Sequence, residues 1–482
     1  MLRRRFGQPS TTLRHDIMTV PYWIQDAIFY QIFPDRFANG DRENDPPNVE
    51  PWGSPPTPWG FQGGDLRGII QRFDYLLDLG VNALYLNPIF LATSNHRYNT
   101  TDYFTIDPKL GSMGDFRALL DLAHRNGVRV VLDGVFNHTG RGFNAFVDLL
   151  ENQEKSPYHN WYHVLHYPVQ AYADGPAKDY LAWWNIRSVP KLNTGNPDVR
   201  KFIFSVARYW IEQGADGWRL DVPNEIDDDS FWGEFRQVVK SVNQDAYLVG
   251  EIWTAEPRWV GDRHFDGLMH YPLRDCLLQL VSTGMMEAGQ CAARFETFLK
   301  LYPRENAYAM LLTLGTHDTE RLLTKLDGDL QKVKLAYLFQ HAYPGAPSIY
   351  YGDEVGLTGG KDPDCRGAFP WDESQWNVEL RNWIKTLITL RKRYSALRRG
   401  DYQPVFADNR RGCFAFARVL GEERILAVVN ASGVQRHLRL PASQLNWQDG
   451  HILRNLLGRE EYLVSGDTVL VNLPPWGGAY II

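Results

Sequence analysis

Charged side chains stand at the ends of short apolar segments in this chain of 482 residues. The segment Gly-Trp-Arg-Leu-Asp places Arg219 and Asp221 two positions apart, so they share one face if the segment is a strand. A guanidinium beside a carboxylate keeps that carboxylate ionised at neutral pH, as a nucleophile requires. A structural ion pair that closes a strand explains the same two residues equally well.

Three further apolar segments end in polar residues, in the sequences Asp-Gly-Val-Phe-Asn-His, Gly-Glu-Ile-Trp and Thr-His-Asp. Taken singly, Asp133 is explained as a loop cap, His138 as a hydrogen-bonded core histidine, and Glu251 as a charge on the rim. Carboxylates and histidines at four strand ends are hard to explain by coincidence. Their joint occurrence favours an active site.

An amphipathic helix, a glycine and a short apolar strand follow one another repeatedly along the chain. Three such units are predicted, with helices over residues 65–80, 115–127 and 196–214 ahead of strands over 81–87, 128–133 and 217–221. Asn196 and Pro197 form a typical helix start. Strands that alternate with helices predict a parallel sheet.

Five more strands are predicted, which makes eight in all; they cover residues 27–33, 247–251, 265–270, 310–315 and 348–351. Eight alternating units predict an α/β fold of the (β/α)8 TIM barrel type, whose active site lies at the carboxyl ends of the strands. A doubly wound open sheet is the competing fold, but no Gly-x-Gly-x-x-Gly turn follows the first strand.

The rest of the chain divides into segments with different sequence patterns. Residues 138–193 are long, polar and aromatic, which predicts a small subdomain inserted after the third strand. After residue 399 short alternating strands predict a C-terminal antiparallel β-sandwich. The expected domains are a flexible tail over 1–20, the barrel over 21–137 and 194–399, the insert over 138–193, and the β-domain over 400–482.

Composition excludes several classes of protein. A net charge of −6 argues against a nucleic-acid binder, and no run of eighteen apolar residues predicts a membrane span. The first residues carry no apolar run, so no secretory signal is predicted. Cys276, Cys291, Cys365 and Cys413 lack metal-ligand spacing and are expected to be free thiols of a cytoplasmic protein.

The four segments that end in charged residues resemble the four signature regions of the α-amylase family of glycoside hydrolases. The resemblance covers nearly the whole chain, from Ala-Ile-Phe-Tyr-Gln-Ile-Phe-Pro-Asp-Arg-Phe near its start to Leu-Pro-Pro-Trp-Gly-Gly near its end. Val-Pro-Lys-Leu-Asn, ending at Asn193, is similar to the Met-Pro-Lys-Leu-Asn of the neopullulanase, cyclomaltodextrinase and maltogenic amylase group. Departures from that group are Val189 for Met, Pro223 for Ala and Thr254 for His.

The resemblance implies a retaining reaction with two carboxyl groups about 5 to 5.5 Å apart. Asp221 is implied as nucleophile and Glu251 as acid and base, the latter with a raised pKa. Asp318 is implied to bind hydroxyls of the distorted sugar, with His138 and His317 donating beside it.

Other sugar-binding residues follow from the same resemblance. Tyr98 is implied to stack on the sugar at the cleavage point beside His96, and Asp362 and Arg366 to grip the next sugar on the non-reducing side. Arg219 would support Asp221, and Glu225 would lie toward the leaving group. Trp253 is a candidate sugar platform, although core packing explains it about equally well.

A calcium ion is expected in the loop after the first strand, because oxygen donors cluster there. The implied ligands are Asn39, Asp41, Asn44, Asp45, Gly63 and Asp65. A solvated polar turn explains the same residues. A second family site would use Asn137, but its other ligands are not evident, and no organic cofactor is expected.

The favoured function is hydrolysis of α-1,4-glucosidic bonds in maltooligosaccharides, cyclodextrins, pullulan or starch. An α-glucosidase or glucan transferase on the same scaffold is the alternative, since the glycosyl intermediate is shared. A non-catalytic carbohydrate-binding relative is a third interpretation, but it predicts a lost carboxylate or a membrane anchor, and the sequence shows neither. The expected partner is an α-glucan, with no nucleic acid and no membrane. Only about 20 residues precede the barrel, so the group's N-terminal β-domain and the dimer built on it are not expected, and the oligomeric state stays open.

Overall fold

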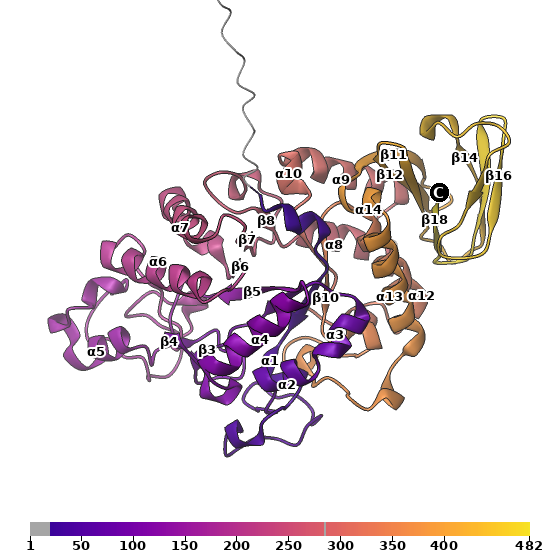
Figure 1. The fold of residues 1–482 in the computed structure, drawn as a ribbon. Helices are drawn as coiled ribbons and strands as arrows, with labels where there is room; N and C mark the ends of the chain where they lie inside the picture. The colour runs from indigo at the N-terminus through magenta and orange to yellow at the C-terminus, as the bar shows by residue number, and fades with distance from the viewer. Residues whose placement is uncertain (1–19, 284–285) are drawn as a thin grey trace, which may run out of the picture.

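A ring of parallel strands forms the centre of the computed structural model, which describes residues 20–283 and 286–482 (Figure 1). The strands follow the order β8-β7-β6-β5-β2-β1-β10-β9, and every neighbouring pair is parallel. A parallel bridge between Met269 and Leu311 joins the two ends of the sheet. The predicted eight-stranded barrel is therefore confirmed. The strands are β1 Phe29–Ile32, β2 Ala83–Leu86, β5 Arg129–Gly134, β6 Gly217–Leu220, β7 Tyr247–Gly250, β8 Gly267–Leu268, β9 Leu311–Thr313 and β10 Ala346–Tyr350.

Helices surround this sheet (Figure 1). They are α1 Pro34–Phe37, α2 Leu66–Gln71, α3 Phe73–Leu79, α4 Met113–Arg125, α6 Pro197–Glu212, α7 Asp229–Val242, α8 Tyr271–Leu278, α9 Ala288–Leu301, α10 Arg304–Ala307, α11 Leu322–Lys325, α12 Leu330–Ala342, α13 Val378–Arg393 and α14 Ser395–Arg399. The Asp65 side chain accepts a hydrogen bond from Gly68 N at 2.6 Å and caps α2. Gly80 ends α3 with φ 97°, a left-handed conformation that glycine adopts without strain.

Two predicted helices differ from those observed. The single helix expected over residues 65–80 is two, because Arg72 leaves the helical conformation with ψ 13°. The helix expected to begin at Asp115 begins at Met113, because the Ser112 hydroxyl accepts a hydrogen bond from Asp115 N and caps the earlier turn.

Segments that follow β2 and β5 extend from the barrel on the side away from the C-terminus (Figure 1). The first is an antiparallel hairpin of β3 Phe90–Ala92 and β4 Thr100–Ile106, which the sequence pattern did not predict. The second is residues 138–193, which contain α5 Asn144–Asn152 and isolated bridges such as His138 to Lys191. That bridge pairs the beginning of this segment with its end.

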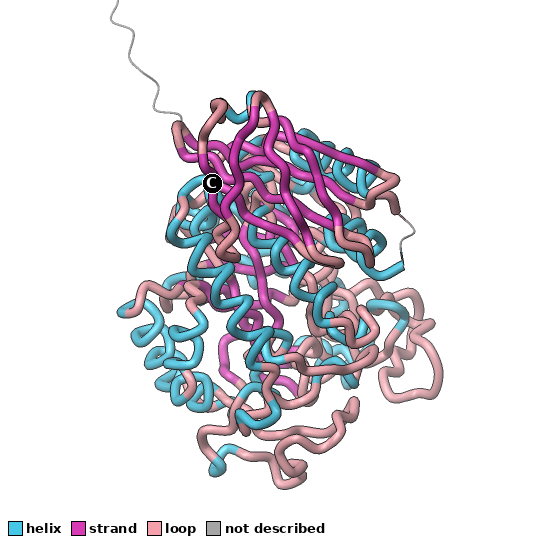
Figure 2. Tube along the Cα trace, turned by 90° about the vertical axis from the view of Figure 1, so that its right-hand side faces the viewer, coloured by secondary structure: helices cyan, strands magenta, loops and turns pink. Residues whose placement is uncertain are grey.

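The C-terminal part consists of two antiparallel four-stranded sheets, ordered β11-β12-β13-β18 and β14-β17-β16-β15. Leu426, Leu438 and Val469, one from each of three strands, are fully buried in one shared apolar cluster. The predicted β-sandwich is therefore confirmed, and Figure 2 shows its strands crossing the front of the molecule. The strands are β11 Asp401–Asp408, β12 Cys413–Leu420, β13 Glu423–Asn430, β14 Arg436–Pro441, β15 Ile452–Arg454, β16 Glu461–Ser465, β17 Thr468–Leu473 and β18 Gly478–Ile481.

Two expectations concern the ends and the surface of the chain. The tail expected over residues 1–20 lies, except for Val20, outside the described residues. Among residues 20–283 and 286–482, no helix has both the length and the apolar character needed to cross a membrane.

Candidate active site

Three neighbouring strands of the barrel bring the predicted carboxylates to one mouth. Asp133 lies in β5 and pairs in register with Arg219 of β6, while Asp221 and Glu251 follow the last residues of β6 and β7. A Cβ at Gly217 would lie 2.2 Å from the carbonyl oxygen of Tyr247. Only glycine therefore lets β6 lie this close to β7, and this contact sets the position of Arg219.

The Arg219 guanidinium is fully buried and lies among three carboxylates. Its Nη1 donates to Asp133 Oδ1 at 2.8 Å and to Asp221 Oδ1 at 2.9 Å. Its Nη2 lies 2.9 Å from Glu251 Oε2, an ion pair whose angle falls outside that of a hydrogen bond. The sequence predicted one partner for this arginine, and the structure gives it three.

Burial raises the pKa of both carboxyl groups at this mouth, that of Asp221 well above its ordinary value. Burial raises the pKa of Asp221, Arg219 opposes that shift, and the neighbouring carboxylates add to it. Burial also raises the pKa of Glu251 to about 7, again against the effect of Arg219. Closely spaced carboxylates cannot all ionise together. Arg219 makes a well-aligned hydrogen bond with Asp221 and only an ion pair with Glu251, so the two carboxyl groups differ in their support by this guanidinium.

Val222 holds Glu251 through a strained backbone that the sequence did not indicate. Its φ of 36° and ψ of 50° are left-handed, an outlier for a β-branched residue. This conformation lets Val222 N donate to Glu251 Oε2 at 3.1 Å. Trp253 Nε1 donates to the other oxygen, Oε1, at 3.3 Å. Both oxygens of Glu251 are thus oriented by neighbours on the carboxyl side of β6 and β7.

The side chain of His317 has a fixed tautomer. Gln31 Nε2 and Asn87 Nδ2 both donate to its Nδ1, at 3.0 and 3.1 Å, so its proton is on Nε2. That nitrogen lies 2.7 Å from Tyr98 Oη and 3.0 Å from Asp318 Oδ2. Burial lowers the pKa of His317 well below its ordinary value, so the ring is neutral. Gln31 and Asn87 were missed, although an amide inside an apolar strand is a readable signal.

Tyr98 links this histidine to the carboxylates. Its hydroxyl donates to Asp133 Oδ2 at 2.7 Å, and its ring is parallel to that of His317, with centroids 5.3 Å apart. The His96 ring lies 6.0 Å from it, and His96 Nδ1 accepts from Tyr98 N. His138 Nε2 donates to the Tyr98 carbonyl at 3.0 Å, so this proton orients the backbone of Tyr98. Burial lowers the pKa of His138 to about 4 and of His96 to about 3.

Arg366 connects the predicted residues of the non-reducing side. Its Nη2 lies 3.3 Å from Asp318 Oδ1, its Nη1 lies 3.2 Å from Asp362 Oδ1, and its Nε donates to the carbonyl of His317. Burial raises the pKa of Asp318, with Arg366 and Arg219 opposing. The structure therefore brings Asp318, Asp362 and Arg366 together.

Comparison with known proteins agrees with this constellation. The family model described as "Alpha amylase, catalytic domain" matches residues 31–400. The chain belongs to the α-amylase family. A second family model, "Maltogenic Amylase, C-terminal domain", matches residues 402–480 of this glycosidase.

Individual relatives are also similar over most of the chain. A cyclomaltodextrinase of Geobacillus thermopakistaniensis is 44% identical over 96% of this chain and 78% of its own length. Neopullulanase 2 of Thermoactinomyces vulgaris is 43% identical over 96% and 79%. The cyclic alpha-maltosyl-(1→6)-maltose hydrolase of Arthrobacter globiformis, solved with that sugar, has a TM-score of 0.87 and 42% identity, covering 96% of this chain and 99% of that one.

Residues after β7 and β6 also form an aromatic pair and an ion pair. Trp253 is 47% exposed and stacks on Tyr271, with centroids 3.7 Å apart and planes at 9°. Lys191 Nζ lies 3.1 Å from Glu225 Oε2 and donates to the Glu225 carbonyl at 2.8 Å. The contacts between Lys191 and Glu225 thus join the segment before α6 to the turn after β6. Lys191 was not among the predicted site residues.

The predicted calcium loop contains oxygen atoms that lack partners. Asn39 Oδ1 and Asn44 Oδ1 are buried without a hydrogen bond, while their amide nitrogens donate to Asp45 Oδ1 at 2.8 Å and Asp65 Oδ2 at 3.1 Å. A Cβ at Gly63 would lie 2.2 Å from Asp45 Oδ1, so glycine keeps this space open. The described residues hold no metal-binding group of three or more His, Cys, Asp or Glu side chains. Any cation here would depend on the two amides.

Two of the six predicted ligands have other partners. Asp41 Oδ2 accepts from Arg67 Nη1 at 2.6 Å, an ion pair at the surface. Asp65 accepts from the backbone nitrogens of Gly40, Asp41 and Gly68, which fixes the loop and caps α2. The residues that fit a hard cation are therefore Asn39, Asn44 and Asp45 around Gly63.

Proposed function

We propose that this enzyme hydrolyses α-1,4-glucosidic bonds in maltooligosaccharides, cyclodextrins, pullulan or starch, with retention of the anomeric configuration. The observation that carries this proposal is the Arg219 fork, which contacts Asp221 and Glu251 at 2.9 Å each. One guanidinium holds both carboxyl groups on one side of the mouth. That arrangement favours the close spacing of retaining enzymes, about 5 to 5.5 Å, over the wider spacing of inverting ones.

Asp221 is the proposed nucleophile. Its Oδ1 is occupied by Arg219, and within the described part of the chain no donor approaches its Oδ2. In the first step Oδ2 bonds to the anomeric carbon while Glu251 gives its proton to the glycosidic oxygen. The bond between that carbon and oxygen breaks, and the leaving sugar departs with the proton.

Glu251 acts as base in the second step. Its carboxylate takes a proton from water, the water oxygen bonds to the anomeric carbon, and the bond to Asp221 breaks. The pKa of about 7 suits both roles, because a group that titrates near the working pH gives and takes a proton with similar ease.

The remaining residues bind and orient sugar. Asp318 accepts hydroxyl protons from the ring under attack, and the neutral His317 lies beside it. Tyr98 stacks on that ring. The other proposed contacts are His96 next to Tyr98, Asp362 and Arg366 with the next sugar, and Trp253 and Glu225 on the leaving-group side. His138, which was expected to donate to the sugar, instead positions Tyr98, because its Nε2 proton goes to the Tyr98 carbonyl.

A calcium ion is a proposed structural component held by Asn39, Asn44 and Asp45 near Gly63. The two buried amide oxygens without a hydrogen bond support it, because an unpaired buried acceptor is costly and a cation would satisfy it. Such an ion would stabilise the loop after β1 by neutralising Asp45.

We also propose that the protein is cytoplasmic. The four cysteines are buried free thiols, and Cys276 Sγ lies in hydrogen-bond contact with Cys291 Sγ at 2.8 Å. Proteins of oxidising compartments tend to pair such residues, so free thiols support a reducing environment.

Product analysis tests the proposed reaction. Incubation with maltotriose, a cyclodextrin and pullulan, followed by chromatography and by NMR of the freshly released anomeric proton, should show shorter maltooligosaccharides with α configuration. A β product would contradict retention. Products longer than the substrate at low substrate concentration would favour the transferase alternative.

A further inference from the structure

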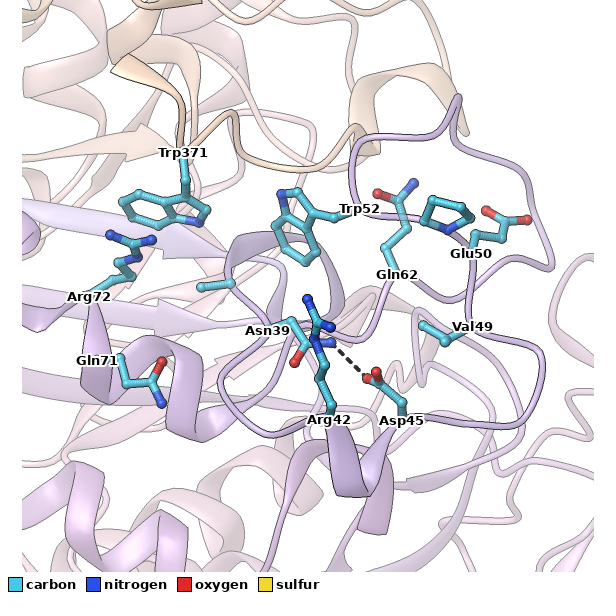
Figure 3. A pocket seen from close by; sticks show the side chains of 12 residues that line it. Asn39, Arg42, Asp45, Val49, Glu50, Trp52, Gln62, Gln71, Arg72 and Trp371 are labelled. Atoms are coloured by element: carbon cyan, nitrogen blue, oxygen red, sulfur yellow. Dashed lines mark hydrogen bonds between the residues drawn. The ribbon is translucent and has the colours of Figure 1, made fainter. Parts of the chain in front are cut away.

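A cavity outside the catalytic mouth lies between the loop after β1 and the segment that follows β10 (Figure 3). Its volume is about 570 Å³, within the range of about 300 to 1,000 Å³ typical of small-molecule sites. None of the lining residues belongs to the catalytic constellation. They are Ala38, Asn39, Arg42, Asp45, Val49, Glu50, Pro51, Trp52, Gln62, Gln71, Arg72 and Trp371.

Two tryptophans give this cavity rigid apolar walls. Trp52 Nε1 donates to the Phe369 carbonyl at 3.0 Å, and Trp371 Nε1 donates to the Phe37 carbonyl at 2.6 Å. The edge of the Trp371 ring packs against Phe37, with centroids 5.2 Å apart. In the described chain no aromatic ring or cation covers the Trp52 ring. A flat, fixed indole face is therefore available to a ligand.

Planar polar groups surround these rings. Arg72 lies over the Trp371 ring at 4.2 Å, and neither Arg72 nor Arg42 has a carboxylate within ion-pair distance among residues 20–283 and 286–482. Gln71 Nε2 donates to the Gly40 carbonyl at 2.9 Å, which leaves its oxygen as an acceptor. The cavity thus offers both donors and acceptors that are not already used.

The chemistry of the lining selects the ligand. Asn39 and Asp45 are also proposed calcium ligands, so a ligand in the cavity would meet the Trp52 ring, the guanidinium groups of Arg42 and Arg72, and the Gln71 amide. Carbon-hydrogen faces of a pyranose pack on indole rings, and its hydroxyl groups both donate to and accept from planar side chains. A neutral sugar satisfies both requirements, whereas a purely apolar ligand would leave the polar groups unpaired.

We propose that this cavity binds a glucose unit of an α-glucan chain, as a second sugar site separate from the catalytic mouth. The choice of α-glucan rests on the proposed function, but the site itself rests on the cavity. Such a site would hold long substrates by a second point of attachment, so its loss should weaken the use of long chains more than that of short ones.

Calorimetric titration of the full-length Glu251→Gln variant with maltotriose tests the proposal, because this variant binds sugar with little turnover. Two sites per chain are expected. Adding Trp52→Ala should leave one site, whereas adding Trp59→Ala should leave two, because Trp59 is 83% exposed in the same loop and does not line the cavity. One site in the Glu251→Gln protein would overturn the proposal and identify the cavity as merely hydrated.

Two further measurements keep the test decisive. If Trp52→Ala lowers the melting temperature strongly, Gln71→Ala with Arg72→Ala, both at exposed positions, should weaken the second site at least tenfold instead. With Glu251 restored, the Trp52→Ala enzyme should cleave maltotriose like the wild type but soluble starch several-fold more slowly. An equal effect on both substrates would contradict the second site, whereas wild-type failure to cleave either would contradict the proposed function instead.

Discussion

Arg219 Nη1 lies 2.9 Å from Asp221 Oδ1 in a fully buried setting, and the same nitrogen lies 2.8 Å from Asp133 Oδ1. Among the described residues, no donor forms a hydrogen bond with Asp221 Oδ2. A buried carboxylate keeps its charge only with such support, since burial alone raises the pKa of Asp221. The guanidinium is therefore the feature that would allow Asp221 to act as the proposed nucleophile.

Arg219→Lys should lower kcat by about 100-fold or more, because an ammonium cannot reach three carboxylates as the planar fork does. The acidic limb of the kcat/KM pH profile should move to higher pH, since the pKa of Asp221 rises further when its support weakens. Arg391→Lys is the matched control. Arg391 is also fully buried but donates to backbone carbonyls such as that of His341, so its loss should reduce stability without moving the profile.

The basic limb of the same profile should lie near pH 7, where Glu251 loses its proton. The stability effect has a definite sign. Folding raises the pKa of Glu251 from 4.5 to about 7. The contribution of its protonated side chain to the free energy of unfolding is therefore fully present below pH 4.5 and is lost as the pH rises through 7. Glu251→Gln should therefore raise the melting temperature relative to wild type more at pH 8 than at pH 4.5. An equal difference at both pH values would rule out this ionisation.

Val222→Gly tests the strained backbone beside Glu251. A β-branched residue with φ 36° costs about 1 to 3 kcal/mol, which glycine avoids. The variant should lose less than about 1 kcal/mol of unfolding free energy and keep its activity within a few-fold, because Val222 N still reaches Glu251. Val238→Gly, at a half-buried helical position in α7, should lose about 1 kcal/mol or more. Equal losses in urea unfolding would show that Val222 is not strained.

Removal of calcium should lower the melting temperature, and added Ca²⁺ should restore it. Asp45→Ala should abolish that response, because Asp45 is the carboxylate beside both the Asn39 amide and Gly63. Asp41→Ala should keep the response, since Asp41 pairs with Arg67. A melting temperature that a chelator leaves unchanged in the wild type would count against the ion.

Much of the barrel was predictable because each strand is a short apolar run, and a helix-ending glycine precedes β2, β5 and β6. The β3–β4 hairpin was missed, since neither of its strands follows that pattern. The break at Arg72 was missed as well, because the apolar spacing continues across it and only the conformation of Arg72 changes.

Some residues of the site were predictable from the sequence and others were not. Asp221 and Glu251 were predictable because each follows an apolar strand. The three partners of Arg219 were not, because Asp133 and Glu251 approach it through the register of neighbouring strands, which no spacing along the chain encodes. Val222 was also unpredictable, since valine normally favours extended backbone and only the tertiary structure imposes a left-handed conformation.

Trapping the glycosyl-enzyme tests the central claim most directly. The Glu251→Gln variant should react with an α-glycosyl fluoride, whose leaving group needs no proton, and then hydrolyse slowly because it lacks the base. Mass spectrometry of proteolytic peptides should find one sugar added at Asp221, and none when Asp221→Asn is added. A sugar attached to another residue, or wild-type turnover by Asp221→Asn, would contradict the account.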